Sequence, residues 1–179
     1  MDEIRDRNGL TEAQYLKSYN SDAWKKPSLT ADICIIARKA DMDSVLLIKR
    51  GNHPYLGKWA LPGGFSEEGE RIEETAAREL LEETGIKMDS QDLKLVGVYS
   101  KPGRDPRGWT VSAAYLAVVN QDDVAPQAAD DASEAMWFEI VRDREMIRLK
   151  ADELELSLDD LAFDHNDIMM DVLKVAYDE

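Results

Sequence analysis

One stretch, from Gly63 to Ile86, constrains this chain more than any other, because it crowds carboxylates onto a short helix behind a glycine turn. The turn is Pro62-Gly63-Gly64, and the pattern predicts a helix from about Arg71 to Gly85, a glycine well placed as a C-terminal cap. Like charges three or four residues apart on a helix repel by about 0.2–0.5 kcal/mol per pair. A divalent cation would reverse the sign of this interaction, so the stretch indicates a metal site.

The predicted helix has two faces of different chemistry. Successive helical residues turn by about 100°, which brings Glu79, Glu82 and Glu83 onto one face. We expect the opposite side to pack on a sheet through Ala77, Leu80, Leu81 and Thr84. A solvated acidic face is the alternative interpretation for a helix rich in glutamate.

The spacing of these residues resembles the complete signature of the Nudix hydrolases. Five residues separate Gly64 from Glu70, and seven more lead to Arg78-Glu79-Leu80-x-Glu82-Glu83-x-Gly85-Ile86. The approach from Gly57 to Phe65 is also similar to the family's entry into this motif. The resemblance implies an α/β (α+β) fold, with a mixed β-sheet sandwiched between α-helices, and cleavage of a nucleoside diphosphate linked to another moiety.

The same resemblance implies roles for individual residues. The metal, Mg²⁺ or alternatively Mn²⁺, would be held by Glu79, Glu82, Glu83, Glu70 and the backbone carbonyl of Gly63. Arg78 would orient the glutamates through a salt bridge. Hard oxygen ligands of this kind hold Mg²⁺ against a pyrophosphate in phosphoryl transfer. Three candidates remain for the base that activates water: Glu79, Asp131 and Glu134.

Substrate choice depends on residues outside this motif. The loop Lys101–Arg107 and the following Val111–Tyr115 resemble segments of bacterial ADP-ribose pyrophosphatases and of related Nudix-type regulators. Planar guanidinium groups suit a diphosphate or a terminal ribose, so Arg104 and Arg107 are predicted to bind substrate. Arg50, directly after a strand, is a further candidate for a phosphate contact.

Three functions are therefore expected in order. The first is Mg²⁺-dependent hydrolysis of ADP-ribose to AMP and ribose 5-phosphate. The second is hydrolysis of another substrate: a nucleoside triphosphate, NADH or a dinucleoside polyphosphate. The third is an ADP-ribose-sensing regulator that binds DNA, which would need a DNA-binding module, whereas the segment after Trp137 is short and acidic.

Charge and cysteine content limit the partners. Lys and Arg total 22 against 37 Asp and Glu, a net charge of −15 that would repel nucleic acid. Cys34 is the only cysteine, so no intrachain disulfide can form and a cytoplasmic location is expected. The first residues do not resemble a signal peptide, and no apolar run reaches about 18 residues, so no membrane association is expected.

The remaining patterns predict one domain over residues 1–179. An N-terminal helical segment covers about 1–28, where Thr11 and Gln14 form a capping box for a helix over Glu12–Tyr19. An extra hairpin is expected over about 144–158. Other strands are predicted at Thr30–Ala37, Ser44–Ile48, Leu93–Ser100, Trp109–Val119 and Ala135–Ile140, and a last helix from His165 with Asp164 as its cap. By resemblance, the N-terminal segment is a candidate for homodimerisation.

Overall fold

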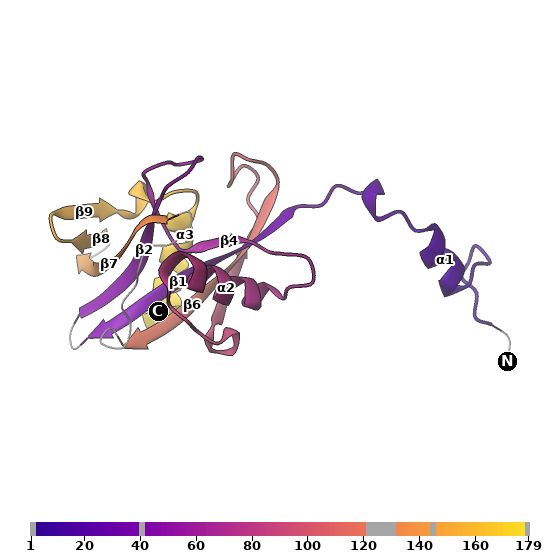
Figure 1. The fold of residues 1–179 in the computed structure, drawn as a ribbon, viewed down its shortest axis with the longest axis horizontal. Helices are drawn as coiled ribbons and strands as arrows, with labels where there is room; N and C mark the ends of the chain where they lie inside the picture. The colour runs from indigo at the N-terminus through magenta and orange to yellow at the C-terminus, as the bar shows by residue number, and fades with distance from the viewer. Residues whose placement is uncertain (1–2, 40–41, 121–131, 144–145, 178–179) are drawn as a thin grey trace.

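A mixed β-sheet forms the body of the protein, in a computed structural model that describes residues 3–39, 42–120, 132–143 and 146–177. Helix α2 (Ile72–Thr84) covers one face of the sheet and α3 (His165–Tyr177) covers the other (Figure 1). The sandwich of helices around a mixed sheet predicted from the sequence is therefore confirmed. None of the helices in these residues is long and apolar enough to span a membrane.

The sheet order is β5-β6-β1-β2-β7-β8-β9, with β3 paired to β2 and β4 paired to β1. The pair β1–β6 is parallel, and the other pairs are antiparallel. The strands are β1 (Ser28–Lys39), β2 (Met42–Arg50), β3 (Trp59–Ala60), β4 (Gly63–Phe65), β5 (Lys94–Tyr99), β6 (Thr110–Asn120), β7 (Ala132–Asp143), β8 (Met146–Ala151) and β9 (Leu154–Ser157). The hairpin predicted over about 144–158 is present as β8–β9. The strands predicted at Thr30–Ala37 and Ser44–Ile48 form the antiparallel pair β1–β2.

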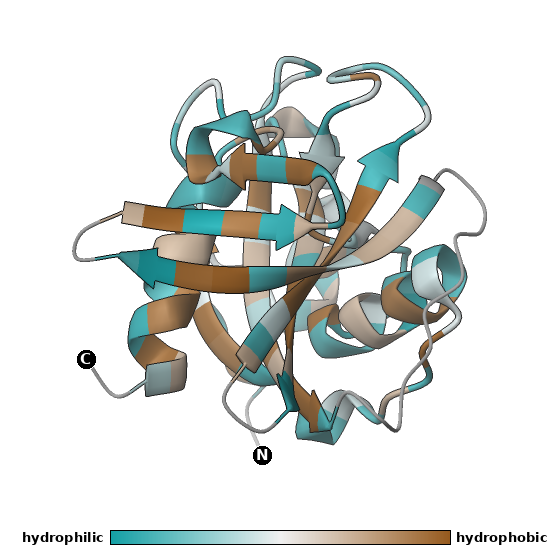
Figure 2. Ribbon diagram, turned by 90° about the vertical axis from the view of Figure 1, so that its left-hand side faces the viewer, coloured by the Kyte–Doolittle hydropathy of each residue, from teal (hydrophilic) through white to brown (hydrophobic). Residues whose placement is uncertain are grey.

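Strand β1 explains why the sheet is covered on both sides. Its side chains alternate between the two faces, and both sets are apolar. Ile33 and Ile35 pack in the cluster under α2, whereas Cys34 and Ile36 pack in the cluster under α3. All four residues are fully buried. The hydrophobic segments accordingly run along the central strands, and the loops are mostly hydrophilic (Figure 2).

Helix α2 ends as predicted, and its buried face differs from the predicted one at Leu81. Gly85 has a φ of 71° and donates its N–H to the Leu81 carbonyl at 2.9 Å, which confirms the glycine cap. The prediction that Leu81 packs on the sheet is wrong, because this residue is 45% exposed. Leu80 and Thr84 are buried as predicted, and Ala77 packs partly buried against the cluster under α2. Thr75, Ala76 and Glu83 are buried as well. The helix is rotated so that Glu83, one of the three glutamates of the acidic face, is buried.

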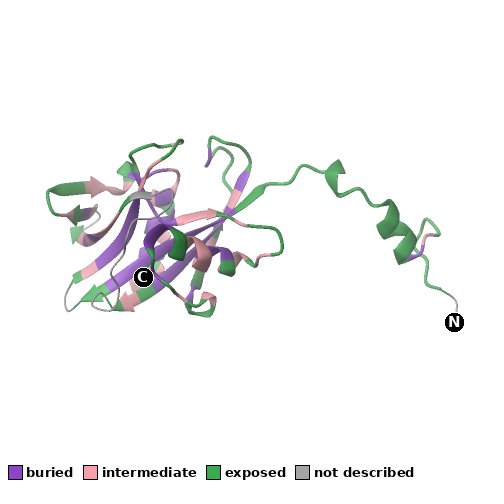
Figure 3. Ribbon diagram, viewed as in Figure 1, coloured by how far each residue is buried: buried purple, intermediate pink, exposed green. Residues whose placement is uncertain are grey.

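The N-terminal segment extends away from the body. Helix α1 (Glu12–Ser18) has the predicted capping box, with hydrogen bonds of 3.3 Å and 3.0 Å between Thr11 and Gln14. The large side chains of this helix remain exposed within this chain: Tyr15, Leu16 and Tyr19 are 46%, 61% and 51% exposed. Nearly the whole segment is exposed (Figures 1 and 3).

Candidate active site

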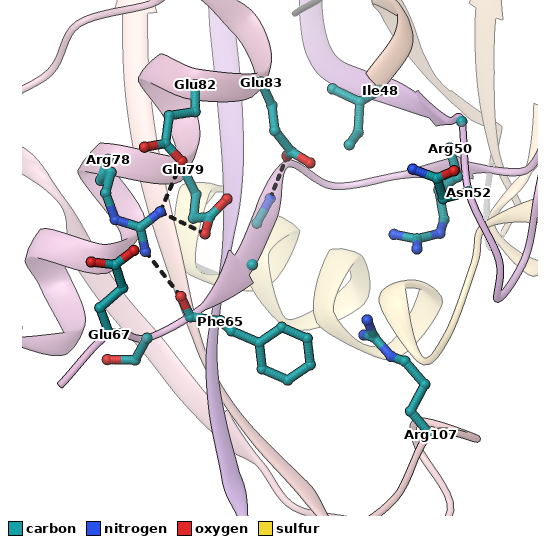
Figure 4. A pocket seen from close by; sticks show the side chains of 14 residues that line it. Ile48, Arg50, Asn52, Phe65, Glu67, Arg78, Glu79, Glu82, Glu83 and Arg107 are labelled. Atoms are coloured by element: carbon teal, nitrogen blue, oxygen red, sulfur yellow. Dashed lines mark hydrogen bonds and ion pairs between the residues drawn. The ribbon is translucent and has the colours of Figure 1, made fainter. Parts of the chain in front are cut away.

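The acidic helix and the glycine turn meet in one cavity of about 550 Å³. Strand β4 pairs with β1 and passes directly beside α2, so Gly63 and Gly64 lie against the glutamates. Glu79, Glu82 and Glu83 line one wall, and Arg50 and Arg107 line the other (Figure 4). The cavity therefore places negative charge opposite positive charge.

Arg78 is the common partner of the glutamates on the acidic wall. Its Nε lies 2.8 Å from Glu70 Oε1, and its Nη1 lies 2.8 Å from both Glu79 Oε1 and Glu82 Oε2. Its Nη2 donates to Glu70 Oε2 at 3.1 Å and to the carbonyl of Phe65 at 2.9 Å. These five hydrogen bonds use every donor that a guanidinium has. The arginine thus fixes three carboxylates relative to the backbone of β4.

Glu70 is the carboxylate that Arg78 stabilises most. The hydrogen bonds from Arg78 lower the pKa of Glu70 to about 2, although partial burial opposes them. The Thr75 hydroxyl also donates to Glu70, at 2.7 Å. Glu70 is thus ionised, and its hydrogen bonds to Arg78 and Thr75 connect the loop before α2 to the helix.

The carboxylate charges of Glu83 and Glu79 are less compensated than that of Glu70. Burial raises the pKa of Glu83 to about 8, against the hydrogen bond of 2.8 Å that it accepts from the Gly63 N–H. Burial also raises the pKa of Glu79, against its bonds to Arg78. A Cβ atom on Gly64 would overlap the Glu79 carboxylate, so glycine is required for this close approach. The site thus holds one buried carboxylate, Glu83, and one half-buried carboxylate, Glu79, whose charged forms a cation would stabilise.

These residues fit a hard divalent cation in their chemistry. Carboxylate and carbonyl oxygens are what Mg²⁺ and Mn²⁺ take from proteins. Burial raises the pKa of Glu79 and of Glu83 because it disfavours their charged forms, which a cation would stabilise. Within residues 3–39, 42–120, 132–143 and 146–177, no three acidic, His or Cys side chains converge as a ready metal cluster. The reason is local: Glu79 and Glu82 are both turned toward Arg78.

The opposite wall presents two of the predicted substrate arginines. The Arg50 Nε donates to the Pro54 carbonyl at 2.7 Å. Arg107 pairs with Asp105 through Nη2 at 2.7 Å and lies over the Phe65 ring, 4.7 Å from its centroid. Both arginines line the cavity and face the glutamates (Figure 4).

The third predicted substrate arginine, Arg104, does not line this cavity. Its side chain is only 4% exposed and is bound to Asp164, at 2.9 Å and 2.7 Å, and to Asp32 at 3.3 Å. Burial lowers its pKa, but the two aspartates outweigh this effect and leave it raised. Arg104 is thus part of a buried ion-pair network with Asp164 and Asp32. It lines a small neighbouring pocket of about 30 Å³.

The predicted base Glu134 faces away from the cavity. It lies opposite Lys49 in the β2–β7 ladder and pairs with its ammonium group at 2.8 Å. Ile48 and Arg50, the neighbours of Lys49 in β2, line the cavity. Because side chains alternate along a strand, Lys49 and Glu134 project from the other face. This argues against Glu134 as a base; the alternative, Asp131, lies outside the described residues.

Two residues that the sequence patterns did not single out belong to the surroundings of the site. Asp32 is buried and contacts Arg104, Ser112 and His165. An aspartate within an otherwise apolar strand was a usable signal, since a buried carboxylate needs partners. Phe163 borders the small pocket of about 30 Å³ next to the cavity.

Comparison with known proteins agrees with the geometry. A model of the NUDIX domain matches residues 27–152. An ADP-ribose pyrophosphatase from Methanocaldococcus jannaschii is 41% identical over 132 residues, which are 74% of this chain and 67% of that protein.

Two further similar proteins are a transcriptional repressor and a NUDIX domain solved with ADP ribose. The ADPR responsive transcriptional repressor NtrR of Acinetobacter baylyi is 34% identical over 164 residues, 90% of this chain but only 59% of that protein. The NUDIX domain of Shewanella oneidensis NrtR, solved in complex with ADP ribose, is 30% identical with a TM-score of 0.73. That match covers 93% of this chain and 99% of the solved one.

Proposed function

Because the chain belongs to the NUDIX family, we propose that it is an ADP-ribose pyrophosphatase that hydrolyses ADP-ribose to AMP and ribose 5-phosphate. The observation that carries the proposal is the cavity with Glu79, Glu82 and Glu83 on one wall and Arg50 and Arg107 on the other. Such a cavity suits a diphosphate that bridges cations and arginines.

The residues of the site would have separate roles in metal binding, substrate binding and proton transfer. Glu79, Glu82, Glu83, Glu70 and the Gly63 carbonyl would hold Mg²⁺ or Mn²⁺, and Arg78 would keep the glutamates in place. The bound metal would supply an activated water and neutralise charge on the leaving phosphate. Arg50 and Arg107 would bind the diphosphate through planar donors. Glu79, half-buried with a raised pKa, is our candidate for accepting the proton of the water.

A substrate panel tests this proposal. ADP-ribose, NADH, diadenosine polyphosphates and nucleoside triphosphates are each incubated with the protein and Mg²⁺, and in parallel with Mn²⁺. We expect ADP-ribose to give the highest kcat/KM, with AMP and ribose 5-phosphate as products. Negligible turnover of ADP-ribose beside strong hydrolysis of another member would assign the site to that substrate instead.

A second candidate function is an ADP-ribose-sensing regulator. It is favoured by the similarity to the Acinetobacter baylyi repressor, of which this chain spans 59%. The net charge of −15 disfavours DNA contact by this chain. Salt-dependent binding of the purified protein to DNA, released by ADP-ribose, would support the regulator.

We further propose that two copies associate through the N-terminal segment. Its exposed apolar side chains include Leu16 and Trp24, which are 61% and 70% exposed. An isolated segment with such residues gains stability by burying them against a partner. Light scattering should give a dimer for the unmodified protein and a monomer for the Leu16→Glu, Trp24→Glu double variant. An unchanged dimer would place the interface elsewhere.

A further inference from the structure

Phe163 occupies a backbone position that rarely holds a bulky side chain. Its φ is 56°, at the first central position of a turn closed by the His165 N–H and the Ala162 carbonyl at 3.2 Å. Glycine is normally preferred where φ is positive, and an aromatic residue there is unfavourable. The Ala162 N–H also donates to the Trp59 carbonyl at 2.8 Å. The surrounding framework therefore fixes where the Phe163 ring lies.

The ring is shared by both arginines of the cavity wall. The guanidinium carbon of Arg50 lies 4.9 Å from the ring centroid, and that of Arg107 lies 5.7 Å from it. Tyr55, with a φ of 60°, packs edge-on against the same ring at 4.7 Å. Guanidinium groups are attracted to aromatic faces at these distances. Two aromatic residues with positive φ, distant in sequence, thus meet beside the cations.

This arrangement keeps two positive charges close together. Like charges repel, and the repulsion is larger where water is partly excluded. Arg107 is compensated by Asp105, and Arg50 by a carbonyl and further contacts. The ring attracts both cations without neutralising them. An anionic group in the cavity would gain attraction from both.

We infer that Phe163 is a positioning residue, whose ring holds Arg50 and Arg107 where both bind the anionic diphosphate of the substrate. This inference rests on the proposed function of the cavity. A purely structural role is the competing explanation, since Phe163 also packs on the small cluster of Ile48, Ala60 and Ala162. Leucine can fill that packing role but cannot attract a guanidinium.

Steady-state kinetics separate the two roles. Phe163→Leu should raise KM for ADP-ribose about tenfold with kcat within about twofold, because ground-state binding by two arginines is weakened. Phe163→Tyr, which keeps the ring, should restore KM. Asp152→Gly is the matched control: Asp152 also has a positive φ, of 49°, but lies in the β8–β9 turn. An unchanged KM in Phe163→Leu would overturn the inference.

A double-mutant cycle tests whether Phe163 acts through the arginines. In the Arg50→Ala, Arg107→Ala background, adding Phe163→Leu should change kcat/KM by less than about twofold, because the residues it positions are gone. A full additional loss would mean that Phe163 touches the substrate or supports the fold, and would refute positioning.

A readout without substrate completes the test. In ¹⁵N-edited NMR spectra, the Nε–H signals of Arg50 and Arg107 should shift in Phe163→Leu through loss of the ring current, whereas that of Arg148 should not. Unmoved signals would refute the geometry even if ADP-ribose is hydrolysed. If ADP-ribose is not hydrolysed, the proposed function fails, and the kinetic series is run with whichever panel member is turned over.

Discussion

Arg78 and Glu70 form a bidentate ion pair, with Nε–Oε1 and Nη2–Oε2 distances of 2.8 Å and 3.1 Å. The pair joins the loop before α2 to the middle of the helix, and the remaining donors of Arg78 reach Glu79, Glu82 and the Phe65 carbonyl. One planar group therefore sets the positions of three carboxylates and of β4.

Replacing Arg78 by lysine keeps the charge but removes this geometry. A lysine has three donors and no planar fork, so it cannot hold Glu70, Glu79 and Glu82 together. We expect Arg78→Lys to weaken the apparent Mg²⁺ affinity and turnover by about 10–100-fold. Rates measured over a Mg²⁺ titration test this. A variant with the native Mg²⁺ dependence would show that the arginine does not orient the glutamates.

Two neighbouring glycines should respond differently to alanine. A Cβ on Gly63 would meet the Ala31 carbonyl and the Asp32 backbone, so Gly63→Ala should lower the free energy of unfolding by about 1–3 kcal/mol. The three atoms nearest to a Cβ on Gly64 would all belong to the flexible Glu79 carboxylate. Gly64→Ala should therefore leave urea unfolding nearly unchanged and reduce turnover by about 10–100-fold. The reverse pattern would contradict these assignments.

Local spacing predicted the elements that carry the acidic wall. The helix end at Gly85 and the α3 start at His165 follow from caps and hydrophobic periodicity, which depend on neighbours in the chain. Glu79, Glu82 and Glu83 line the same cavity for the same reason, because helical spacing alone puts them on one side of α2.

Contacts between distant segments could not be predicted in this way. Arg104 looks like an exposed loop residue, but Asp164, 60 positions later, buries it. The direction in which Glu134 projects depends on the pairing register of β7 with β2, which no local pattern predicts. The burial of Glu83 in place of Leu81 depends on how α2 is rotated against β4.

The metal-helix assignment can be tested at Glu82 and Glu83. Glu82→Gln and Glu83→Gln should each reduce turnover by at least about 100-fold, since a direct ligand matters more than its supports. Both should remain folded, because glutamine fills the same space and still accepts the Gly63 N–H in place of Glu83. Glu68→Gln, an exposed neighbour outside the motif, serves as the control. Near-native rates in both variants would defeat the assignment.

Mg²⁺ binding itself provides a second measurement on the same variants. A ligand that binds only the folded state raises its melting temperature. Mg²⁺ should therefore stabilise the unmodified protein and Glu68→Gln, and stabilise Glu83→Gln much less. Equal shifts in all three proteins would place the cation away from Glu83.

The buried Asp32 should control stability at acid pH. Burial raises its pKa, but His165, the Ser112 hydroxyl at 2.5 Å and Arg104 outweigh burial and leave the pKa below its ordinary 3.8. A carboxyl with a lowered folded-state pKa stabilises the fold above the unfolded value, and this stabilisation is lost as pH falls through the folded value. Asp32→Asn should lower the free energy of unfolding at pH 7 by about 3–5 kcal/mol, because Arg104 loses a buried partner.

The pH dependence distinguishes this charge effect from a packing defect. The stability difference between the unmodified protein and Asp32→Asn should shrink below pH 4, where Asp32 becomes protonated in the unfolded and then in the folded chain. Urea unfolding across this range measures it, with the exposed Asp159→Asn as control. A difference that stays the same down to pH 2 would mean that the Asp32 charge does not stabilise the fold, and that Arg104 is held by Asp164 alone.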